Sequence, residues 1–416
     1  MTTHAVKGMR DLVPPEAALW AEVEAKGRDL FALYRYEEIR TPLVEEKILF
    51  ARTLGETTSV VEKEMYAFQD RKGKWLTLRP EGTAGVVRAF VEKGLAATEP
   101  LSRFFYIGSM YRYEQPQQGR QREFHQIGVE AFGSSHPFLD AEVIHMAERY
   151  FVSLGLSGIA LEINSLGCPI CRPKYQTLLA DFLKGKEATL CEECQKRIVK
   201  NPLRALDCKK EGCRQATEEA PILPEHLCES CERHLDQVLE GLGLLGTSYR
   251  INPRIVRGLD YYLRTTFEFT SPDLGAQNAV AGGGRYDGLV HLLGGPNLPG
   301  FGFAIGMERL IDLVWKQVPP HSKAVATVFV APIGEKGLQE GFRLAKKLRE
   351  EGIAVEIDYE AKSLKSSMRR ADRIGASHVI ILGDDELKKG IAMIKEMKGG
   401  GQKEVKIVEL SARLFV

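Results

Sequence analysis

The hydrophobic and polar positions of the chain change their period along its length, and each period predicts a different element. Apolar residues recur every three or four positions over residues 16–34, 83–93 and 140–154, which predicts three amphipathic helices. Residues 65–79 alternate on either side of a polar turn and predict a β-hairpin. Residues 37–44 predict a short strand, and because a proline within it lacks an N–H donor, we expect it at a sheet edge or an interface.

Two longer strands are predicted next, over residues 103–114 and 123–132, with a glutamine-rich loop between them. Successive side chains of a strand point to opposite faces, so Ile127 and Val129 are expected to face the core. The other surface carries charged, amide, aromatic and glycine residues: Arg112 and Glu114 of the first strand, and Phe124, Gln126, Gly128 and Glu130 of the second. The pattern therefore predicts a polar, glycine-lined sheet surface that suits a ligand.

The same pattern resumes after an interruption in the middle of the chain. Strands are predicted over residues 161–165, 261–270 and 277–281, and residues 299–306 predict a segment that leads into a further helix. The glycine-rich run at residues 282–288 is expected to let the backbone approach a ligand closely.

The pattern of apolar and polar residues changes in the C-terminal part, after a predicted proline-containing linker at residues 319–323. Short apolar strands alternate there with helices: strands over residues 327–331, 354–357 and 378–382, and helices over residues 337–351 and 364–374. This alternation predicts a small parallel or mixed α/β domain.

Composition and charge limit the classes of protein that fit. With 416 residues and 44% hydrophobic content, the chain can form two or three domains with apolar cores. The net charge of +1 provides no global field that would recruit nucleic acid, so any RNA contact must come from local patches. The N-terminus lacks the apolar segment of a signal peptide, and no apolar run is long enough to span a bilayer. We therefore expect a cytoplasmic protein that makes no membrane contact.

All eight cysteines lie between residues 168 and 231, in four pairs: Cys168 and Cys171, Cys191 and Cys194, Cys208 and Cys213, and Cys228 and Cys231. Pairs at such spacing can chelate Zn²⁺ from a turn, and four pairs can build two four-cysteine sites. Disulfides are disfavoured in a reducing compartment, and a metal-free interpretation, in which the cysteines are only small residues, stays open. Any zinc is expected to be structural. The composition of this segment differs from its surroundings and predicts an insertion.

Three segments that are far apart in the sequence offer side chains of both charge signs: residues 79–83, 104–130 and 257–262. Their guanidinium groups suit phosphate: Arg112, Arg120, Arg122 and Arg257. Their acidic and amide groups suit an amine and a heterocyclic N–H: Glu81, Gln126 and Glu130. Such a mixture is typical of a site that joins a small amino-bearing ligand to a nucleotide.

Six segments together match one family. Four of them are Lys7-Gly-Met-Arg-Asp-Leu12, Thr41-Pro42, Tyr111 to Phe124, and Gly302-Phe-Ala-Ile-Gly-Met-Glu-Arg309. The other two are Arg257-Gly-Leu-Asp-Tyr-Tyr262 and Ala281-Gly-Gly-Gly-Arg-Tyr-Asp-Gly288. Along essentially its full length the chain resembles the histidyl-tRNA synthetases, which are class II aminoacyl-tRNA synthetases. Segments two to four resemble the three motifs of the class, whereas the last two resemble signatures of histidine recognition.

The resemblance implies that histidine is activated with ATP as histidyl-adenylate and then transferred to the terminal adenosine of tRNA(His). Arg112 is expected at the α-phosphate, and Arg309 along the γ-phosphate or adenine. Arg257 is expected to bridge the histidine carboxylate and the α-phosphate, with Mg²⁺ at the pyrophosphate. The resemblance assigns further ATP contacts to Glu114, Arg120 and Phe124.

The resemblance also implies how histidine is bound. Contacts to its α-amino group are expected from Glu81, Thr83 and Gln126. Glu130 and Tyr262 are expected at the two imidazole nitrogens, and Tyr261 is expected to shape the pocket. A site that hydrogen-bonds its substrate in this way can reject analogues by about 10⁴–10⁵, which fits the lack of a segment that would suggest an editing domain.

The implied fold is of the α+β class: an antiparallel sheet flanked by helices, an inserted small domain, and a C-terminal α/β anticodon-binding domain. The expected bounds are 1–166 and 241–320 for the two parts of the catalytic domain, 167–240 for the cysteine-rich insertion, and 325–416 for the C-terminal domain. The resemblance further implies a homodimer with Pro42 near the shared surface, and an insertion that clamps the acceptor arm of the tRNA.

Two other functions stay open. The first is a non-catalytic, histidine-sensing regulatory paralogue of a phosphoribosyltransferase, which would be expected to lose the phosphate-binding arginines and the C-terminal domain. The second is a tRNA-binding sensor without catalysis. A basic cluster in the C-terminal part also has two interpretations, an RNA-binding surface or a solvated helix face: Lys362, Lys365, Arg369, Arg370 and Arg373.

Overall fold

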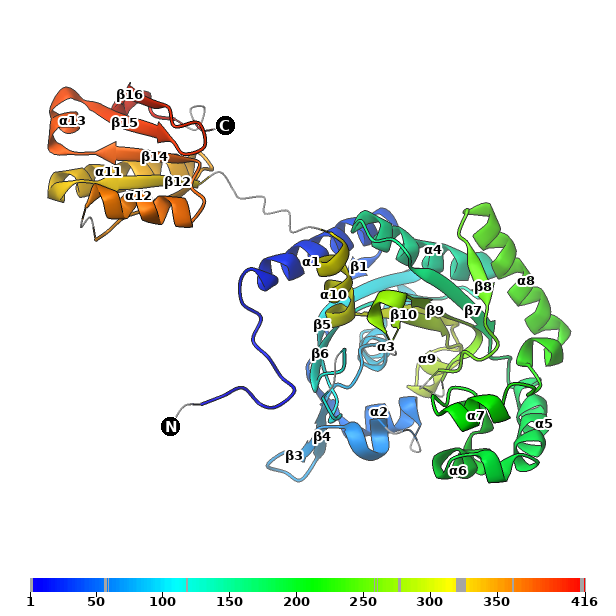
Figure 1. Ribbon diagram of the computed structural model, residues 1–416. Coiled ribbons are helices and arrows are strands. Elements are labelled where there is room, and N and C mark those ends of the chain that lie inside the picture. Colours follow the sequence, from blue (N-terminus) through cyan, green and yellow to red (C-terminus); the bar gives the residue numbers. More distant parts are fainter. Residues whose placement is uncertain are drawn as a thin grey trace. The chain divides into compact units, whose positions relative to one another are not determined.

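The computed structural model describes residues 3–55, 58, 60–116, 119–257, 259, 261–275, 278–318, 327–360, 363–411 and 415. The chain divides into two compact units, Met1–Pro320 and His321–Val416 (Figure 1). The predicted linker at residues 319–323 lies outside the described residues. Among the helices that are described, none combines the length and the apolar character that crossing a bilayer requires.

An eight-stranded sheet forms the centre of the first unit, in the order β1-β5-β6-β11-β10-β9-β7-β8. Neighbouring strands are antiparallel except at the two edges, where β1 is parallel to β5 and β8 is parallel to β7. The strands are β1 (Glu37–Glu38), β5 (Ser102–Tyr111), β6 (Glu123–Phe132), β7 (Ala160–Ser165), β8 (Tyr249–Ile251), β9 (Leu263–Thr270), β10 (Ala279–Arg285) and β11 (Gly300–Gly306). The strand predicted over residues 37–44 is divided: only Glu37–Glu38 form β1, at the edge of this sheet, Pro42 lies outside any strand, and Val44 belongs to a different sheet.

One face of this sheet is apolar and carries the main core. Ile127 and Val129 of β6 are fully buried in it, as predicted from the alternation of the strand. Three helices contribute buried side chains to the same core: α1 (Glu16–Leu33), α4 (Pro137–Ser153) and α10 (Met307–Gln317) (Figure 1). The predicted helices over residues 16–34 and 140–154 are thereby confirmed.

The opposite face is polar and rich in small residues. The strand register aligns Glu268, Gly282, Ala304, Gly128 and Tyr106 in one row across β9, β10, β11, β6 and β5. The next row on this face contains Thr266, Gly284, Gly302 and Glu130. Helices α3 (Thr83–Glu92) and α9 (Leu289–Leu292) pack over part of it. Because these rows carry few large side chains, residues from the surrounding loops can reach onto the sheet.

A smaller antiparallel sheet stands beside the central one, in the order β2-β4-β3. Its strands are β2 (Val44–Glu46), β3 (Ala67–Gln69) and β4 (Trp75–Leu78), so the predicted hairpin over residues 65–79 is confirmed. Helix α2 (Lys47–Leu54), which was not predicted, packs against β2 and β4.

The segment between β7 and β8 contains helices α5 (Arg172–Lys184), α6 (Glu192–Lys200), α7 (Glu211–Ala216) and α8 (Glu229–Leu244). The first three helices share an apolar core of their own, to which Tyr175, Leu179 and Ile198 belong. Helix α8 instead packs against α4 and adds Val238 and Leu242 to the core of the sheet. It therefore joins the inserted segment to the eight-stranded sheet.

The second unit is a five-stranded sheet in the order β13-β12-β14-β15-β16. Its elements are β12 (Thr327–Pro332), β13 (Ala354–Ile357), β14 (His378–Leu382), β15 (Ile391–Glu396), β16 (Gln402–Lys406), α11 (Gly334–Glu350), α12 (Leu364–Arg373) and α13 (Asp384–Lys389). The first three strands are mutually parallel and the last two run antiparallel, which gives the mixed sheet that the sequence left open. The strands β15 and β16 were not predicted: β16 has a single apolar residue, Val405, whereas β15 begins with the apolar run Ile391–Ile394, so its signal was present.

Two predicted boundaries are wrong. Strand β5 ends at Tyr111, because the Glu114 N–H bonds back to the Arg112 carbonyl at 2.8 Å and turns the chain; Arg112 and Glu114 therefore lie in a loop and do not share a strand face. The strand predicted over residues 277–281 does not end at Ala281 but continues to Arg285, so residues 282–285 of the glycine run belong to β10 in the middle of the sheet; Gln277 lies outside the described residues.

Candidate active site

A buried tyrosine that sequence reasoning missed forms the floor of the site. Tyr106 lies against two glycines: a Cβ on Gly128 would lie 2.0 Å from the Tyr106 ring, and a Cβ on Gly82 would lie 2.2 Å from it. Burial raises the pKa of Tyr106 well above its ordinary value, and the nearby Glu130 and Glu81 raise it further. The glycines of this face therefore make room for side chains of the site itself.

Glu130 is the most deeply buried acid of the site, with 1% of its surface exposed. Its carboxylate accepts hydrogen bonds from the Thr83 hydroxyl at 2.6 Å and from the Tyr286 hydroxyl. Burial raises the pKa of Glu130 to about 8, which the two hydrogen bonds oppose and the neighbouring Glu81 supports. A group with this pKa can change its protonation state when a ligand binds near neutral pH.

Glu81 stands next to Glu130 at the start of α3. Its carboxylate accepts from the backbone N–H groups of Thr83 at 2.7 Å and Ala84 at 2.8 Å, which otherwise lack partners at a helix N-terminus. Burial raises the pKa of Glu81, and the helix N–H groups and Arg112 lower it. Thr83 therefore contacts both carboxylates and fixes their separation.

Three tyrosine rings pack against one another beside these carboxylates. The Tyr261 and Tyr262 centroids are 4.6 Å apart, and Tyr286 meets both rings edge-on. Burial raises the pKa of Tyr262; the positive charge of Arg257 lowers this pKa and the negative charge of Glu130 raises it. Gln126, at the open end, has a buried side-chain oxygen without a hydrogen-bond partner among the described residues. Such an orphaned acceptor indicates room for a ligand donor.

Arg257 lies directly over the sheet. A Cβ on Gly282 would lie 2.4 Å from the Nη1 atom of Arg257. Glycine at this position of β10 therefore leaves the space that the guanidinium group occupies. Nη1 donates to Glu268 at 2.5 Å, and the ring of Tyr262 lies 5.4 Å from the guanidinium carbon. The buried Nε atom of Arg257 has no partner among the described residues. Arg257 therefore keeps a donor available for a ligand.

The remaining phosphate-type arginines approach the same face. Arg112 donates to the Pro80 carbonyl at 2.9 Å and stacks over Phe124 at 5.1 Å. Arg309 donates to the Ala279 carbonyl at 2.7 Å, and its pKa is lowered by burial and by Arg120, whereas Glu114 and Glu268 raise it. Glu268 therefore lies close to both Arg257 and Arg309.

The loop after β5 holds the other predicted ATP contacts. Arg120 pairs with Glu114 at 3.3 Å, and together with Tyr113 they line a hollow of about 380 Å³. Arg122 stacks over the Tyr113 ring at 4.0 Å and donates to the Glu114 carbonyl, so it braces the loop.

The structure thus brings the predicted histidine and ATP residues to one face of the sheet. The residues that sequence reasoning missed are Tyr106, Tyr286 and Glu268. Tyr286 belongs to the glycine-rich run that was predicted to approach a ligand, so the sequence did point to its neighbourhood. Tyr106 and Glu268 lie within strands of ordinary composition, and nothing in the sequence around them indicates a functional site.

Comparisons with known proteins agree with this geometry. A sequence model of the family described as Histidyl-tRNA synthetase matches residues 8–310, and one described as Anticodon binding domain matches residues 327–414. The histidine–tRNA ligase of Geobacter sulfurreducens is 49% identical, with 98% of this chain and 99% of that protein covered. The histidine–tRNA ligase of Anaeromyxobacter dehalogenans is also 49% identical, with 100% of both chains covered. The chain belongs to the histidyl-tRNA synthetase family.

Membership of the histidyl-tRNA synthetase family extends to the three-dimensional structure. The crystal structure of apo histidyl-tRNA synthetase from S. aureus superposes with a TM-score of 0.84 at 33% identity, and covers 100% of both chains. The predicted α+β class, with an antiparallel sheet flanked by helices and a separate C-terminal unit, is confirmed. The leading hypothesis of an aminoacyl-tRNA ligase for histidine is likewise confirmed, and the regulatory alternative receives no support.

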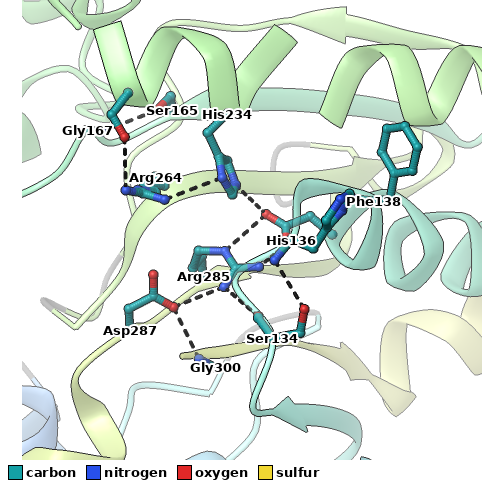
Figure 2. A network of polar contacts seen from close by, with 12 residues as sticks. Ser134, His136, Phe138, Ser165, Gly167, His234, Arg264, Arg285, Asp287 and Gly300 are labelled. Atoms are coloured by element: carbon teal, nitrogen blue, oxygen red, sulfur yellow. Dashed lines mark hydrogen bonds and ion pairs between the residues drawn. The ribbon is translucent and has the colours of Figure 1, made fainter. Parts of the chain in front are cut away.

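A second network anchors the inserted segment of this histidyl-tRNA synthetase to the sheet (Figure 2). Arg285 of β10 is fully buried and pairs with the equally buried Asp140 of α4. Asp140 also contacts His234 of α8 at 2.9 Å, and His234 in turn contacts Arg264 at 3.5 Å. Because an unpaired charge would be costly at this depth, the network fixes α8 against α4 and β10.

The eight cysteines of this family member form two groups of four rather than scattered pairs. The base group is Cys168, Cys171, Cys228 and Cys231, and the distal group is Cys191, Cys194, Cys208 and Cys213. Within each group all four sulfur atoms lie within 4.8 Å of one another. All eight cysteines are free, so the structure contains no disulfide between them.

Proposed function

We propose that the site forms histidyl-adenylate from L-histidine and ATP, and then transfers histidine to the terminal adenosine of tRNA(His). The observation that supports this proposal most directly is the meeting of three guanidinium groups and two buried carboxylates on one sheet face. An adenylyl transfer of this kind needs positioned cations for the anions, and an amino acid with an imidazole needs buried acceptors.

On the phosphate side, Arg257 lies between the two groups that react. The histidine carboxylate attacks the α-phosphorus and pyrophosphate leaves, so two anions must approach each other. Arg112 and Arg257 neutralise that repulsion at the α-phosphate, and Arg309 holds the far end of the nucleotide. ATP also contacts Glu114, Arg120 and the ring of Phe124.

When bound, Mg²⁺ would supply positive charge for the pyrophosphate, and hard oxygen ligands suit this ion. The carboxylates beside the arginines, Glu114 and Glu268, are the groups of this chain that would hold it together with phosphate oxygens. Each carboxylate contacts an arginine, at 3.3 Å for Glu114 and 2.5 Å for Glu268, so the metal and the arginines share the same anionic ligands.

On the amino acid side, the α-amino group donates to acceptors of three residues: Glu81, Thr83 and Gln126. Glu130 accepts from one imidazole nitrogen and Tyr262 contacts the other. Tyr261 and Tyr286 enclose the ring. Because these groups are buried, a ligand without an imidazole leaves them without partners, and that loss selects histidine.

The other parts of the chain contact the tRNA. The bounds remain those of the sequence prediction: a catalytic domain in residues 1–166 and 241–320, an insertion at 167–240 that clamps the acceptor arm, and an anticodon-reading domain at 325–416. In the basic cluster of the last domain, Arg370 pairs with Glu356 at 2.5 Å, and Lys362 lies outside the described residues. Any Zn²⁺ at the cysteines has a structural role. The enzyme works in the cytoplasm, and cell fractionation tests this location.

The chain forms a homodimer through the small sheet and α2, close to Pro42. This region exposes large apolar side chains: Leu43, Val44, Ile48, Phe68 and Trp75. Exposed apolar groups in such number favour a partner surface, and a second copy is the partner that the resemblance implies. We expect a dimer in sedimentation velocity at micromolar concentration and a monomer for Ile48→Glu; a wild-type monomer at every concentration would contradict the proposal.

ATP–pyrophosphate exchange tests the catalytic proposal. Exchange should depend on L-histidine and stay at background with each of the other amino acids, because only an imidazole satisfies Glu130 and Tyr262 together. Histidine binding without exchange, measured by calorimetry on the same sample, would favour the sensor interpretation instead.

A further inference from the structure

The base group of cysteines has the dimensions of a single-ion site. The Cys168 sulfur is 3.8 Å from the Cys171 sulfur and 3.7 Å from the Cys228 sulfur. Four thiolates around Zn²⁺ at about 2.3 Å form a tetrahedron whose sulfurs are roughly 3.8 Å apart. A disulfide would need about 2.05 Å. The spacing therefore fits four thiolates that share one metal ion.

Backbone N–H groups support these thiolates in the way that metal-bound sulfurs require. The N–H groups of Cys168 and Ile170 point at sulfurs of the base group, at 3.3 and 3.4 Å. In the distal group, the Cys191 N–H points at the Cys213 sulfur at 3.2 Å. Such donors orient the ligands and stabilise their charge, which favours metal binding over four neutral thiols.

The base group also closes the inserted segment on itself. Cys168 and Cys171 precede α5, where the segment begins, whereas Cys228 and Cys231 lie at the start of α8, where it ends. An ion shared by both pairs ties the two ends together. The distal group instead lies within the inserted segment, next to its own apolar core.

The residues that flank the first pair hold the histidine-binding loop. Arg172, directly after Cys171, donates from Nη1 to the Tyr262 carbonyl at 2.8 Å. Gly167, directly before Cys168, accepts from the Arg264 N–H at 2.8 Å. Gly167 has a φ of +65°, and a Cβ there would lie 2.8 Å from the Cys171 sulfur. The turn that presents the thiolates therefore also fixes the backbone on both sides of Leu263.

The end of the inserted segment reaches the same loop. Arg264 contacts His234 of α8 at 3.5 Å (Figure 2). It also contacts Ser230 of the same helix at 3.4 Å. Ser230 lies between Cys228 and Cys231, so both cysteine pairs of the base group carry neighbours that contact residues 262–264.

We propose that the two cysteine groups bind one Zn²⁺ each, and that the ion of the base group positions Tyr262 for histidine through Arg172. This inference rests on the proposed histidine activation, because Tyr262 is assigned to the imidazole there. Arg172 is a positioning residue: it holds the main chain of Tyr262, while the Tyr262 ring faces Arg257 and Tyr286. The distal ion stabilises the inserted segment without reaching the pocket.

Metal content and histidine kinetics of the full-length protein test the inference. We expect two zinc ions per wild-type chain by mass spectrometry and one in each of two double variants, Cys228→Ser with Cys231→Ser and Cys208→Ser with Cys213→Ser. Co²⁺ substituted into the wild type should show the absorption of tetrahedral thiolate coordination. Iron in place of zinc, or no metal in freshly purified protein, would overturn the metal assignment.

The two groups should then differ in pyrophosphate exchange. The base-group variant should raise the KM for histidine by about 10–100-fold, as supporting contacts of a site do, with the KM for ATP unchanged. The distal-group variant should leave both KM values unchanged. Equal changes in the two variants would overturn the coupling, whereas failure of the wild type to exchange would refute the proposed function and not the zinc sites.

Arg172 provides a test that leaves every cysteine in place. Arg172→Gln, whose amide donor is too short to reach the Tyr262 carbonyl, should retain two zinc ions and raise the KM for histidine, and Arg172→Lys, which keeps a long, charged donor, should partly restore it. An unchanged KM for histidine in Arg172→Gln would overturn the positioning role even if the cysteine variants proved unfolded.

Discussion

Replacing Arg257 with alanine should lower the rate of ATP–pyrophosphate exchange by about 10²–10³-fold, the loss typical of removing one preorganised charge-stabilising donor. The affinity for histidine should fall much less, because the α-amino and imidazole contacts remain. The structure gives the reason: Arg257 is part-buried over Gly282, and its Nε atom has no partner among the described residues. Single-turnover measurement of adenylate formation, combined with calorimetric histidine binding, separates the two effects.

Two further variants distinguish charge from geometry at this position. Arg257→Lys keeps the charge but loses the planar fork, so it should recover only part of the rate. Glu268→Gln removes the carboxylate that pairs with Arg257 at 2.5 Å, which should leave the arginine less fixed without removing it. If Arg257→Ala weakened histidine binding as much as adenylate formation, Arg257 would act in the ground state and not in the transition state.

The part of the fold that follows from periodicity could be predicted well. Ile127 and Val129 alternate with Gln126, Gly128 and Glu130, and this alternation alone separates the apolar face of β6 from the face of the site. The long helices α1 and α4 follow equally from the spacing of their apolar residues. This spacing is a local property of the sequence, so it can be recognised without knowing which elements pack against the helices.

The purpose of the glycines could not be predicted. The glycine-rich run at residues 282–288 was expected to let the backbone approach a ligand closely, because glycine has no side chain. In the structure, Gly282 makes room for Arg257, and Gly128 makes room for Tyr106. These contacts join residues that are far apart in the chain, so the sequence pattern around either glycine contains no trace of its neighbour.

The cysteines illustrate the same limit. Spacing predicts that Cys168 and Cys171 can act as a pair. The pair that they join begins at Cys228, which is 60 positions further along the chain. The structure selects the pairing by folding α8 back onto the sheet, where His234 and Val238 are buried. Grouping therefore depends on packing that the cysteine spacing does not encode.

Replacing Glu130 with glutamine should nearly abolish histidine activation, with a loss in kcat/KM of roughly 10³-fold or more, since sites that hydrogen-bond a substrate group discriminate by such factors. Thr83 and Tyr286 donate to different oxygens of Glu130. Glutamine keeps one of these acceptors and replaces the other with an amide N–H₂, to which the second hydroxyl can turn as an acceptor, so the packing around the site should stay intact. What the variant loses is the negative charge that receives the imidazole N–H. Exchange kinetics at saturating ATP measure this loss, and an unchanged KM and kcat for histidine would remove Glu130 from the pocket.

The same substitution should stabilise the free protein, in a pH-dependent way. Burial raises the pKa of Glu130 from the ordinary carboxylate value of 4.5 to about 8, so between these values the folded state binds a proton that the unfolded state has lost. The wild type must therefore lose stability as pH rises from about 4.5 to 8, by about 5 kcal/mol at most. Glu130→Gln lacks this titration, so its advantage in urea unfolding should be absent at pH 4.5, grow towards pH 8 and then level off. Histidine affinity of the wild type should rise over the upper part of the same range, from pH 7 to 8, because binding requires the ionised carboxylate. Parallel stability curves for the two proteins would show that the carboxylate is already ionised in the free pocket.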